Sequence, residues 1–417
     1  MTIKKAPPSG AFFFVRSELI DVEIEIYMPQ FTALPPLSLY VHFPWCIRKC
    51  PYCDFNSHAV KKGFDEAGYI NALLADLEQD LPDIWGRPVR TVFFGGGTPS
   101  LFSPQAMDSL LCGVRARLML APDAEITMET NPGTTEHHSF EEYLKAGINR
   151  LSFGVQSFDD RQLKTLGRIH SAEEATRAVI KAKQAGFTNF NLDLMFGLPG
   201  QTAEDARKDV EAAIALNPTH ISYYHLTIEP NTFFHQFPPT LPEDDVSWEI
   251  QAQGQALLAA AGYEHYEVSA HARPGFASRH NINYWTFGDY LGIGAGAHGK
   301  ISKANESCVL RRWKAKHPDE FLRSAATPAR IAGENRVTDD ELLFEFLMNA
   351  LRLHAGFSVE TFTRHTGLSA KVLLGSLHVA ASRGLLEWDE ARQWIRPTEL
   401  GQNFLNDLLA LFLPESA

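Results

Sequence analysis

The chain has 417 residues and a formal net charge of -12, from 38 basic and 50 acidic side chains. This charge has the wrong sign for attracting phosphate backbones, so we expect no nucleic-acid partner. Hydrophobic residues make up 45% of the sequence, as in ordinary globular proteins, and no apolar run approaches the roughly 20 residues of a transmembrane helix.

Residues 1–33 are expected to form an N-terminal extension of uncertain role. The stretch AFFFVRSELIDVEIEIYMPQF fits no targeting pattern. Met28 directly precedes the first segment with clear patterning, PQFTALPPLSLYVHF, and is a candidate for the true start of the chain.

Three cysteines, Cys46, Cys50 and Cys53, lie in YVHFPWCIRKCPYC with the spacing C-x3-C-x2-C. A [4Fe-4S] cluster held by three thiolates keeps one iron open to a substrate or cofactor. Zinc is the alternative, with His42 or His58 completing a Cys3His site, although zinc sites more often use two spaced pairs of ligands. A disulfide fits less well, because five cysteines and no signal peptide are typical of a reducing compartment, here the cytoplasm.

Short apolar runs then alternate with helix-like segments. The predicted strands begin at Leu37, Thr91, Glu125, Arg150, Asn189 and His220. The predicted helices span residues 65–81, 103–118, 171–185 and 202–216, and several open with Ser, Thr or Asp caps. This alternation indicates an α/β fold with a parallel sheet. Six units are too few for an eight-stranded barrel, so we predict a partial (β/α)6 barrel with its chemistry at the carboxyl ends of the strands.

Polar residues at these strand ends are expected to form one rim. GGGTPS, residues 95–100, follows the second strand, and its glycines let backbone approach a ligand, although a tight turn without a ligand is equally consistent. Glu129, Gln156, Arg168 and Asp193 suit recognition of an amino acid and a ribose. Helix capping or pairing with arginine is the structural alternative for the two carboxylates.

A glycine-rich run, GIGAGAHG at residues 292–299, does not match a dinucleotide-binding loop, because Ala297 occupies the position of the third glycine. We interpret it as a close-packed turn near the barrel rim. Cys112 and Cys308 lie outside the cysteine segment, in a helix-like stretch and a polar loop, and are interpreted as bystander thiols.

The pattern changes at about residue 300, where a second domain is expected to begin. Residues 339–351 predict an amphipathic helix, and the following stretch predicts helix, turn, helix, hairpin and helix, as in winged-helix modules. This region mixes acidic with few basic residues, so we expect it to cover the open barrel or to contact a partner. The expected domains are therefore residues 1–33, 34–300 and 301–417.

From about Leu34 onward, a series of motifs resembles the radical S-adenosylmethionine (SAM) enzymes, and within them the branch of oxygen-independent coproporphyrinogen III oxidases and HemW-type heme chaperones. The motifs are YVHFPWC, CPYCDFNSH, GGGTPS, ETNPG, GVQSF, LGRIH, NLDLMFGLPGQT, HLTIEPNT, HNINYW and GIGAGAHG. Their number and order make the resemblance highly specific.

The resemblance implies a [4Fe-4S] cluster on the three cysteines, with the amino and carboxylate groups of SAM on the open iron. An electron from the cluster would then break a carbon–sulfur bond of SAM. The residues implied at SAM are Tyr40, Tyr52 through its backbone, Gly96, Gly97, Thr98, Glu129, Gln156, Arg168 and Asp193. We expect deletion of residues 1–27 to leave cluster binding intact; loss of the cluster would refute this.

Two departures favour the chaperone branch. The oxidases carry a further cysteine two positions after the third, where this chain has Phe55, and their N-terminal segment is unrecognisable here. HNINYW matches the HNxxYW of HemW-like proteins, which implies His280 as a heme ligand flanked by Tyr284 and Trp285. The structural alternative is that His280 only braces the barrel end, and His298 is a weaker alternative ligand.

The resemblance therefore implies a heme chaperone that passes heme to acceptor hemoproteins such as respiratory enzymes, and that lacks oxidase activity. The alternative function is oxygen-independent coproporphyrinogen III oxidation to protoporphyrinogen IX, or another radical SAM reaction on a tetrapyrrole. Peripheral membrane contact and homodimerisation are further hypotheses on this basis.

Overall fold

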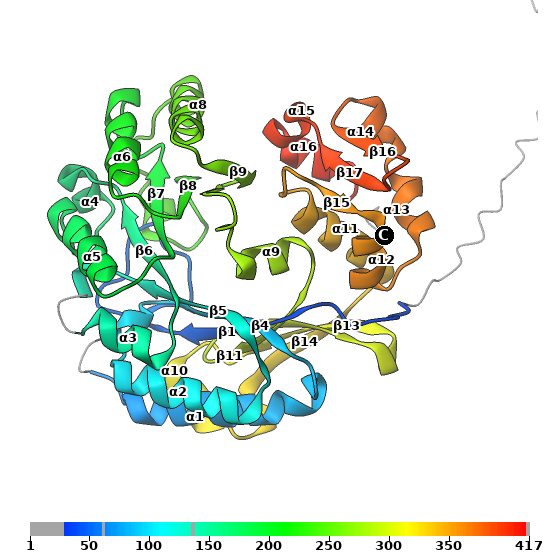
Figure 1. Cartoon of the computed structure of the whole chain (residues 1–417), viewed down its shortest axis with the longest axis horizontal. Coiled ribbons are helices and arrows are strands. Elements are labelled where there is room, and N and C mark those ends of the chain that lie inside the picture. Colours follow the sequence, from blue (N-terminus) through cyan, green and yellow to red (C-terminus); the bar gives the residue numbers. More distant parts are fainter. Residues whose placement is uncertain (1–28, 61–62, 135–137, 414–417) are drawn as a thin grey trace, which may run out of the picture.

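The computed structural model describes residues 29–60, 63–134 and 138–413, so Met28 and most of the expected N-terminal extension lie outside the described residues. Figure 1 shows a large α/β unit beside a smaller C-terminal unit. Within the described ranges, no helix combines the length and apolar character needed to cross a membrane.

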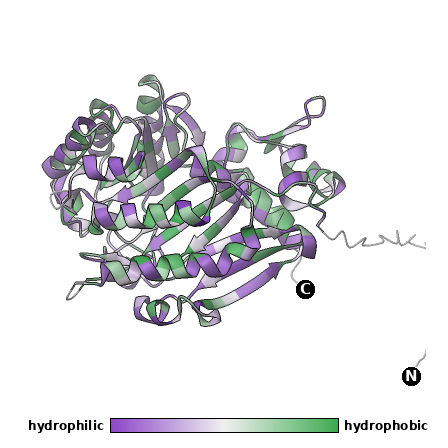
Figure 2. Ribbon diagram, turned by 60° about the horizontal axis from the view of Figure 1, so that its bottom comes forward, coloured by the Kyte–Doolittle hydropathy of each residue, from purple (hydrophilic) through white to green (hydrophobic). Residues whose placement is uncertain are grey.

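The α/β unit is the expected partial barrel. Its six barrel strands run parallel in the order β1, β4, β5, β6, β7, β8. Their bounds are β1 Leu37–Phe43, β4 Val89–Gly96, β5 Leu120–Thr130, β6 Arg150–Gln156, β7 Phe190–Phe196 and β8 His220–His225. All six predicted strands are confirmed. Figure 2 shows many apolar residues along the strands and a mixture of apolar and polar residues on the helices.

Helices connect successive strands and cover the outer face of the sheet (Figure 1). They are α1 Glu66–Ile84, α2 Pro104–Arg117, α3 Phe140–Ala146, α4 Asp160–Thr165, α5 Ala172–Gln184, α6 Ala203–Ala215 and α8 Asp244–Ala260. The short helix α7, Phe233–Gln236, follows β8 and lies beside the cysteine loop, where the Phe234 N–H donates to the Pro51 carbonyl at 3.0 Å. Ser171 and Thr202 form capping boxes with the acidic residues three positions later. These reciprocal bonds satisfy free backbone N–H groups and explain why the predicted helix starts are confirmed.

The sheet continues beyond the six barrel strands at both edges. β11 (Asp289–Ile293) pairs parallel with β1, and β12 (His298–Lys303), β13 (Cys308–Lys314) and β14 (Ile331–Val337) follow as an antiparallel meander. β10 (Ala270–Ala272) and β9 (Glu264–Glu267) extend the other edge. The boundary expected at residue 300 falls inside β12, so we propose Val337 as the division between the two units.

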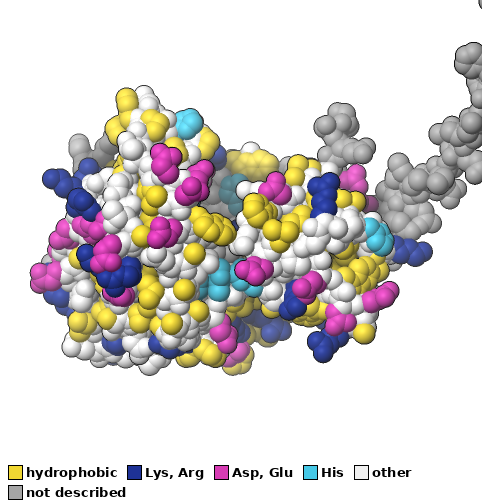
Figure 3. All heavy atoms as spheres, turned by 90° about the horizontal axis from the view of Figure 1, so that it is seen from above, with side chains coloured by type: hydrophobic (Ala, Val, Ile, Leu, Met, Phe, Trp, Pro, Cys, Tyr) yellow, Lys and Arg dark blue, Asp and Glu magenta, His cyan; other side chains and the backbone are white. Residues whose placement is uncertain are grey.

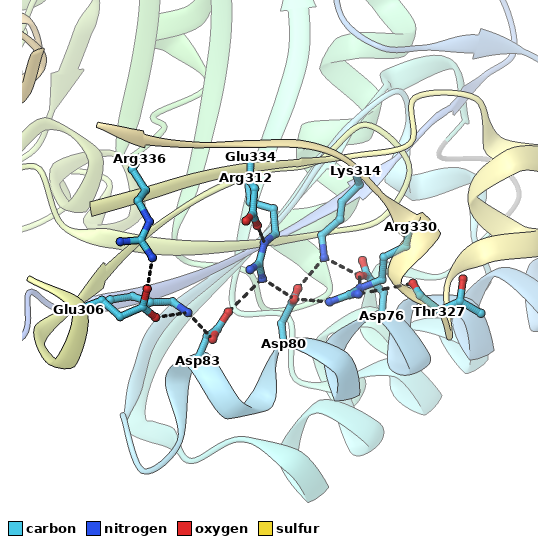
Figure 4. Close-up of polar contacts among 11 residues, drawn as sticks. Asp76, Asp80, Asp83, Glu306, Arg312, Lys314, Thr327, Arg330, Glu334 and Arg336 are labelled. Carbon is cyan, nitrogen blue, oxygen red and sulfur yellow. Dashed lines mark hydrogen bonds and ion pairs between the residues drawn. The ribbon is translucent and has the colours of Figure 1, made fainter. Parts of the chain in front are cut away.

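A buried charge network joins α1 to the meander (Figure 4). Lys314 lies 2.6 Å from Asp76 and 2.5 Å from Asp80, and Arg330 contacts the same two carboxylates at 2.9 and 2.5 Å. Asp76 also accepts a hydrogen bond from the Gly294 N–H at 3.0 Å. Because each buried charge is paired, the network attaches α1 to the added strands and holds the glycine-rich turn.

That turn is close-packed, as expected. A Cβ at Gly292 would lie 1.9 Å from the carbonyl oxygen of His298, and Gly294 and Gly296 have φ of +103° and +77°. Such left-handed backbone favours glycine. The remaining short elements are β2 Trp45–Cys46, β3 His58–Ala59, α9 Arg279–Trp285, α10 Pro318–Ser324 and the 3-10 turns Pro99–Leu101, Pro132–Thr134, Ala304–Glu306 and Pro328–Arg330.

The C-terminal unit has its own hydrophobic core, which includes Leu342, Phe346, Phe362 and Ile395. Its elements are α11 Asp339–Ala350, β15 Phe357–Ser358, α12 Val359–Thr366, α13 Ala370–Ser376, α14 His378–Ser382, β16 Leu386–Asp389, β17 Trp394–Pro397, α15 Glu399–Asn403 and α16 Leu405–Ala410. The predicted succession of helices, hairpin and final helix is confirmed, with β15 adding a third strand.

Candidate functional site

The three clustered cysteines occupy a loop that β1 delivers to the rim of the barrel. β2 and β3 pair in parallel across the base of this loop, through Trp45 with His58. Cys46 is buried, and Cys50 and Cys53 are half-buried; all are free thiols. Burial raises the pKa of the Cys46 and Cys53 thiols above their ordinary value.

Asn56 fastens the end of this loop to the barrel. Its Nδ2 donates to the carbonyl oxygens of Ala295 and Lys316, both at 2.9 Å. The Asn56 carbonyl lies 2.8 Å from Nε2 of His42, which must therefore be the protonated ring nitrogen. Nδ1 then accepts from the Tyr40 hydroxyl at 3.0 Å. Both ring nitrogens of His42 are thus engaged, which weakens its candidacy as a zinc ligand.

The glycine loop after β4 packs against the cysteine loop. The N–H of Gly97 donates to the Phe43 carbonyl at 2.6 Å, and that of Thr98 donates to the Trp45 carbonyl at 2.7 Å. A Cβ on Gly97 would lie 2.4 Å from the same Trp45 oxygen. The absence of a side chain at Gly97 therefore allows the backbones of the glycine loop and the cysteine loop to pack together. The N–H groups of Gly97 and Thr98 are already hydrogen-bonded within the protein, so they are not available to a ligand.

A cavity of about 490 Å³ opens between the cysteine loop, the strand ends and the C-terminal unit. Figure 3, seen from above, shows the surface hollowed between the two units. The predicted rim is confirmed as one assembly in space. Of the predicted residues, the cavity wall contains Cys46, Cys50, Tyr52, Cys53, Gly96, Gly97, Thr98, Glu129, Gln156, Arg168, Asp193 and Trp285.

Two carboxyl groups lie deep in this cavity. Burial, and then the neighbouring Asp193, raise the pKa of Glu129 to about 8. Burial also raises the pKa of Asp193, although that carboxylate accepts from the Ser152 hydroxyl at 3.3 Å and from Asn191 at 2.7 Å. Glu129 accepts a hydrogen bond from the Gly96 N–H at 3.1 Å. Carboxyl groups of this kind, half-buried in a cavity wall, favour a ligand that brings hydrogen-bond donors or positive charge.

Arg168 supplies the positive charge beside the cysteines. Its Nη1 lies 3.7 Å from the Cys50 sulfur and its Nη2 donates to the Gly154 carbonyl at 2.6 Å. Gln156 ends β6 in a left-handed conformation, with φ of +73°, and its Oε1 accepts from the Tyr224 hydroxyl at 2.5 Å. Strained backbone at a strand end is common where a side chain must be directed into a site.

Tyr40 lies outside the main cavity and lines a second one, also about 490 Å³. Gly96 and Glu129 line both, so the two cavities adjoin at these residues. Tyr284 and His298 also line the second cavity. The HNINYW motif therefore divides between the two spaces.

His280 lines neither cavity and is only 1% exposed. Its Nδ1 lies 2.7 Å from the Thr91 hydroxyl, and its ring stacks on Phe93 at 4.9 Å. Its Nε2 is buried without a hydrogen-bond partner. Burial lowers the pKa of His280 to about 3, so the imidazole is neutral. Heme iron can reach this nitrogen only if α9 moves.

Sequence reasoning missed several residues of the main cavity. Arg352 enters from the C-terminal unit, directly after α11, and places its guanidinium carbon 4.2 Å from the centre of the Trp285 ring. Its Nη2 donates to Glu267 at 3.1 Å. No sequence signal identified Arg352 or Glu267, because both reach the site only through the packing of the two units.

Within the described residues, no set of three or more His, Cys, Asp or Glu side chains is arranged to hold a single metal ion. A [4Fe-4S] cluster does not require its ligands to converge on one ion, because each thiolate binds a separate iron atom. Cys112 is exposed on α2 and Cys308 lies on β13, and neither lines the two cavities.

A family model for the radical SAM superfamily matches residues 40–213, and one for the HemN C-terminal domain matches residues 337–404. Heme chaperone HemW of Escherichia coli (strain K12) is 51% identical over 382 residues, which cover 92% of this chain and 99% of that protein. Heme chaperone HemW of Haemophilus influenzae is 48% identical over 386 residues, with coverage of 92% and 99%.

Among solved structures, the coproporphyrinogen III oxidase HemN of Escherichia coli, described as a radical SAM enzyme, matches with a TM-score of 0.76. The match covers 91% of this chain and 90% of that one at 24% identity. At this identity the match shows a common fold.

Proposed function

Because this chain belongs to the HemW family within the radical SAM superfamily, we propose that it is a heme chaperone, which binds heme and transfers it to acceptor hemoproteins. The observation that carries the proposal is the main cavity. It brings together the cysteine loop and two residues of HNINYW, Asn281 and Trp285. A cofactor site and a tetrapyrrole site would thus share one space.

Cys46, Cys50 and Cys53 would hold a [4Fe-4S] cluster. Thiolates are the ligands such a cluster requires, and the three stand on one loop that Asn56 and the glycine loop fasten to the barrel. The guanidinium of Arg168 lies 3.7 Å from the Cys50 sulfur and would donate a hydrogen bond to this ligand of the cluster. When bound, the cluster and SAM supply one-electron chemistry.

SAM fits the polar part of the same cavity. Glu129 and Asp193 offer half-buried carboxyl groups to hydroxyl or amino donors, and Arg168 and Gln156 offer donors to a carboxylate. Gly96, Gly97 and Thr98 would contact SAM through the surface of their loop, and Tyr52 lies on the cysteine loop itself. Tyr40 would act indirectly, by holding His42 and so the Asn56 end of the loop.

Heme ligation by His280 remains part of the proposal. The support is its Nε2, a neutral imidazole nitrogen without a partner, in the same short helix as Tyr284 and Trp285. A neutral imidazole is an ordinary heme-iron ligand. The 1% exposure means that binding requires a shift of α9. We further propose a cytoplasmic location and hemoprotein acceptors such as respiratory enzymes; membrane-surface contact and a homodimer remain hypotheses.

The test uses anaerobically reconstituted protein. Heme is titrated by absorbance, and a parallel assay supplies coproporphyrinogen III, SAM and a reductant. We expect stoichiometric heme binding and no decarboxylation, and a loss of heme affinity in His280→Ala. Turnover to the divinyl product without heme binding would instead identify an oxidase.

A further inference from the structure

One wall of the main cavity is built by residues that neither the cluster nor SAM accounts for. Arg352, Trp285 and Glu267 line it together, with the Arg352 guanidinium over the Trp285 ring at 4.2 Å and bonded to Glu267 at 3.1 Å. Glu267 is 3% exposed and belongs to β9, whereas Arg352 belongs to the C-terminal unit. A cation, an aromatic ring and a carboxylate therefore meet at the junction of the two units.

Backbone contacts hold Arg352 in this position. Glu267 of the edge strand β9 forms an isolated β-bridge with Leu353. The N–H of His354 donates to the Tyr266 carbonyl at 3.1 Å. The residues on the C-terminal side of Arg352 are thus bonded to the barrel edge, and the guanidinium is presented to the cavity by a fixed piece of chain.

This wall has more donors than acceptors. Glu267 engages only Nη2 of Arg352, and the guanidinium Nε is buried without a partner. The indole Nε1 of Trp285 is likewise buried without a partner. A guanidinium has five N–H donors in a planar fork, which matches a carboxylate. A small shift of these side chains toward a carboxylate ligand would satisfy donors that the protein itself does not.

We propose that Arg352 and Trp285 form a subsite for a carboxylate of the tetrapyrrole, one of the two heme propionates. The inference rests on the heme-binding function proposed above. The other carboxylate source is the methionine part of SAM, but the residues suited to SAM lie at the ends of β4 to β7 or, for Arg168, shortly after α4. Arg352 instead stands beside β9, the last strand in the sheet order. The C-terminal unit would thus contribute to cargo recognition.

The experiment compares heme with heme dimethyl ester, which keeps the ring and the iron but lacks free carboxylates. Both are titrated into the reconstituted full chain and into Arg352→Gln and Trp285→Phe. Because Arg352→Gln leaves the buried Glu267 without its cation, the double variant Arg352→Gln/Glu267→Gln, which removes both charges, is included. Arg336→Gln is the matched control, since Arg336 is an exposed arginine of β14 that pairs with Glu306.

For wild type we expect heme to bind about 10- to 100-fold more tightly than the ester, the range for losing a charged hydrogen bond. Arg352→Gln and the double variant should lower heme affinity toward that of the ester and leave ester affinity unchanged. Trp285→Phe should give a smaller loss, and Arg336→Gln none.

Equal weakening of heme and ester in the variants would overturn the subsite, because it would indicate a general structural role. Unchanged heme affinity would overturn it as well. SAM affinity, measured in parallel, should not change; a loss confined to SAM would assign the guanidinium to SAM instead. If wild type binds neither heme nor ester, the chaperone function itself fails, and the subsite fails with it.

Discussion

Arg168 links the cysteine loop to the strand ends of the barrel: its Nη1 lies 3.7 Å from the Cys50 sulfur while its Nη2 donates to the Gly154 carbonyl at 2.6 Å. One side chain thus anchors itself on β6 and places its charge at a thiol on a loop more than one hundred residues earlier. Its Nε is buried without a partner, so the guanidinium retains a donor for a ligand.

Arg168→Gln should make the reduction potential of the reconstituted cluster more negative. Removing a positive charge and a hydrogen bond from a ligand sulfur disfavours the added electron. A change of about 1 kcal/mol corresponds to roughly 40 mV for one electron. A redox titration followed by spectroscopy measures it. Arg161→Gln, at an arginine with a 66% exposed side chain, is the control and should leave the potential unchanged.

Glu129→Gln should stabilise the cofactor-free protein at high pH. In the folded protein the pKa of Glu129 is about 8, above the ordinary 4.5, so protonation of this side chain favours the folded state. Its contribution to the free energy of unfolding is fully present below pH 4.5 and is lost as pH rises through 8. Because glutamine cannot ionise, the variant should avoid this loss of stability, which amounts to roughly a few kcal/mol. Urea unfolding at pH 5 and pH 9 measures the difference, and the variant should exceed wild type only at the higher pH.

The control for Glu129 is Glu173→Gln, an exposed residue of α5 paired with Arg177, where little change is expected at either pH. A Glu129→Gln variant that is less stable than wild type at pH 9 would contradict this prediction. It would show that neighbouring groups stabilise the ionised carboxylate of Glu129 in the folded protein.

Gly97→Ala should impair assembly of the cysteine loop. The new Cβ would lie 2.4 Å from the Trp45 carbonyl oxygen and 2.8 Å from that of Phe43, and backbone cannot easily move away. Overpacking of this kind costs about 1–3 kcal/mol. We expect a lower unfolding midpoint and less iron bound after reconstitution. Gly375→Ala in α13 meets nothing within 4 Å and should instead stabilise by about 0.5–1 kcal/mol.

Replacing Cys46, Cys50 and Cys53 together by alanine should abolish the brown colour and the absorbance near ~400 nm that mark an iron–sulfur cluster. Heme binding should persist, because His280 and Arg352 belong to α9 and the C-terminal unit. The cluster would then act in transfer or dimerisation. Loss of heme binding in this variant would contradict the separation between cluster binding and heme binding. The control is Cys112→Ala, which removes an exposed thiol outside the cysteine loop.

Local sequence patterns were sufficient to predict most elements of the barrel and several of the polar residues at the ends of its strands. Apolar runs and caps such as Ser171 and Thr202 predicted the strands and helices, because their signals lie within a few residues. Glu129, Gln156 and Asp193 could be brought together from the sequence alone, since the carboxyl ends of parallel strands meet at one edge.

Tertiary structure decided what depends on packing between distant segments. The strands β12 to β14 could not be assigned from local pattern, and they join the sheet through pairing and through the Asp76–Lys314 network. HNINYW was visible as a motif, yet only the fold buries His280 and turns Trp285 toward the cavity. Arg352 carried no signal, because its role arises from the docking of its unit on β9, an interaction between residues far apart in the chain.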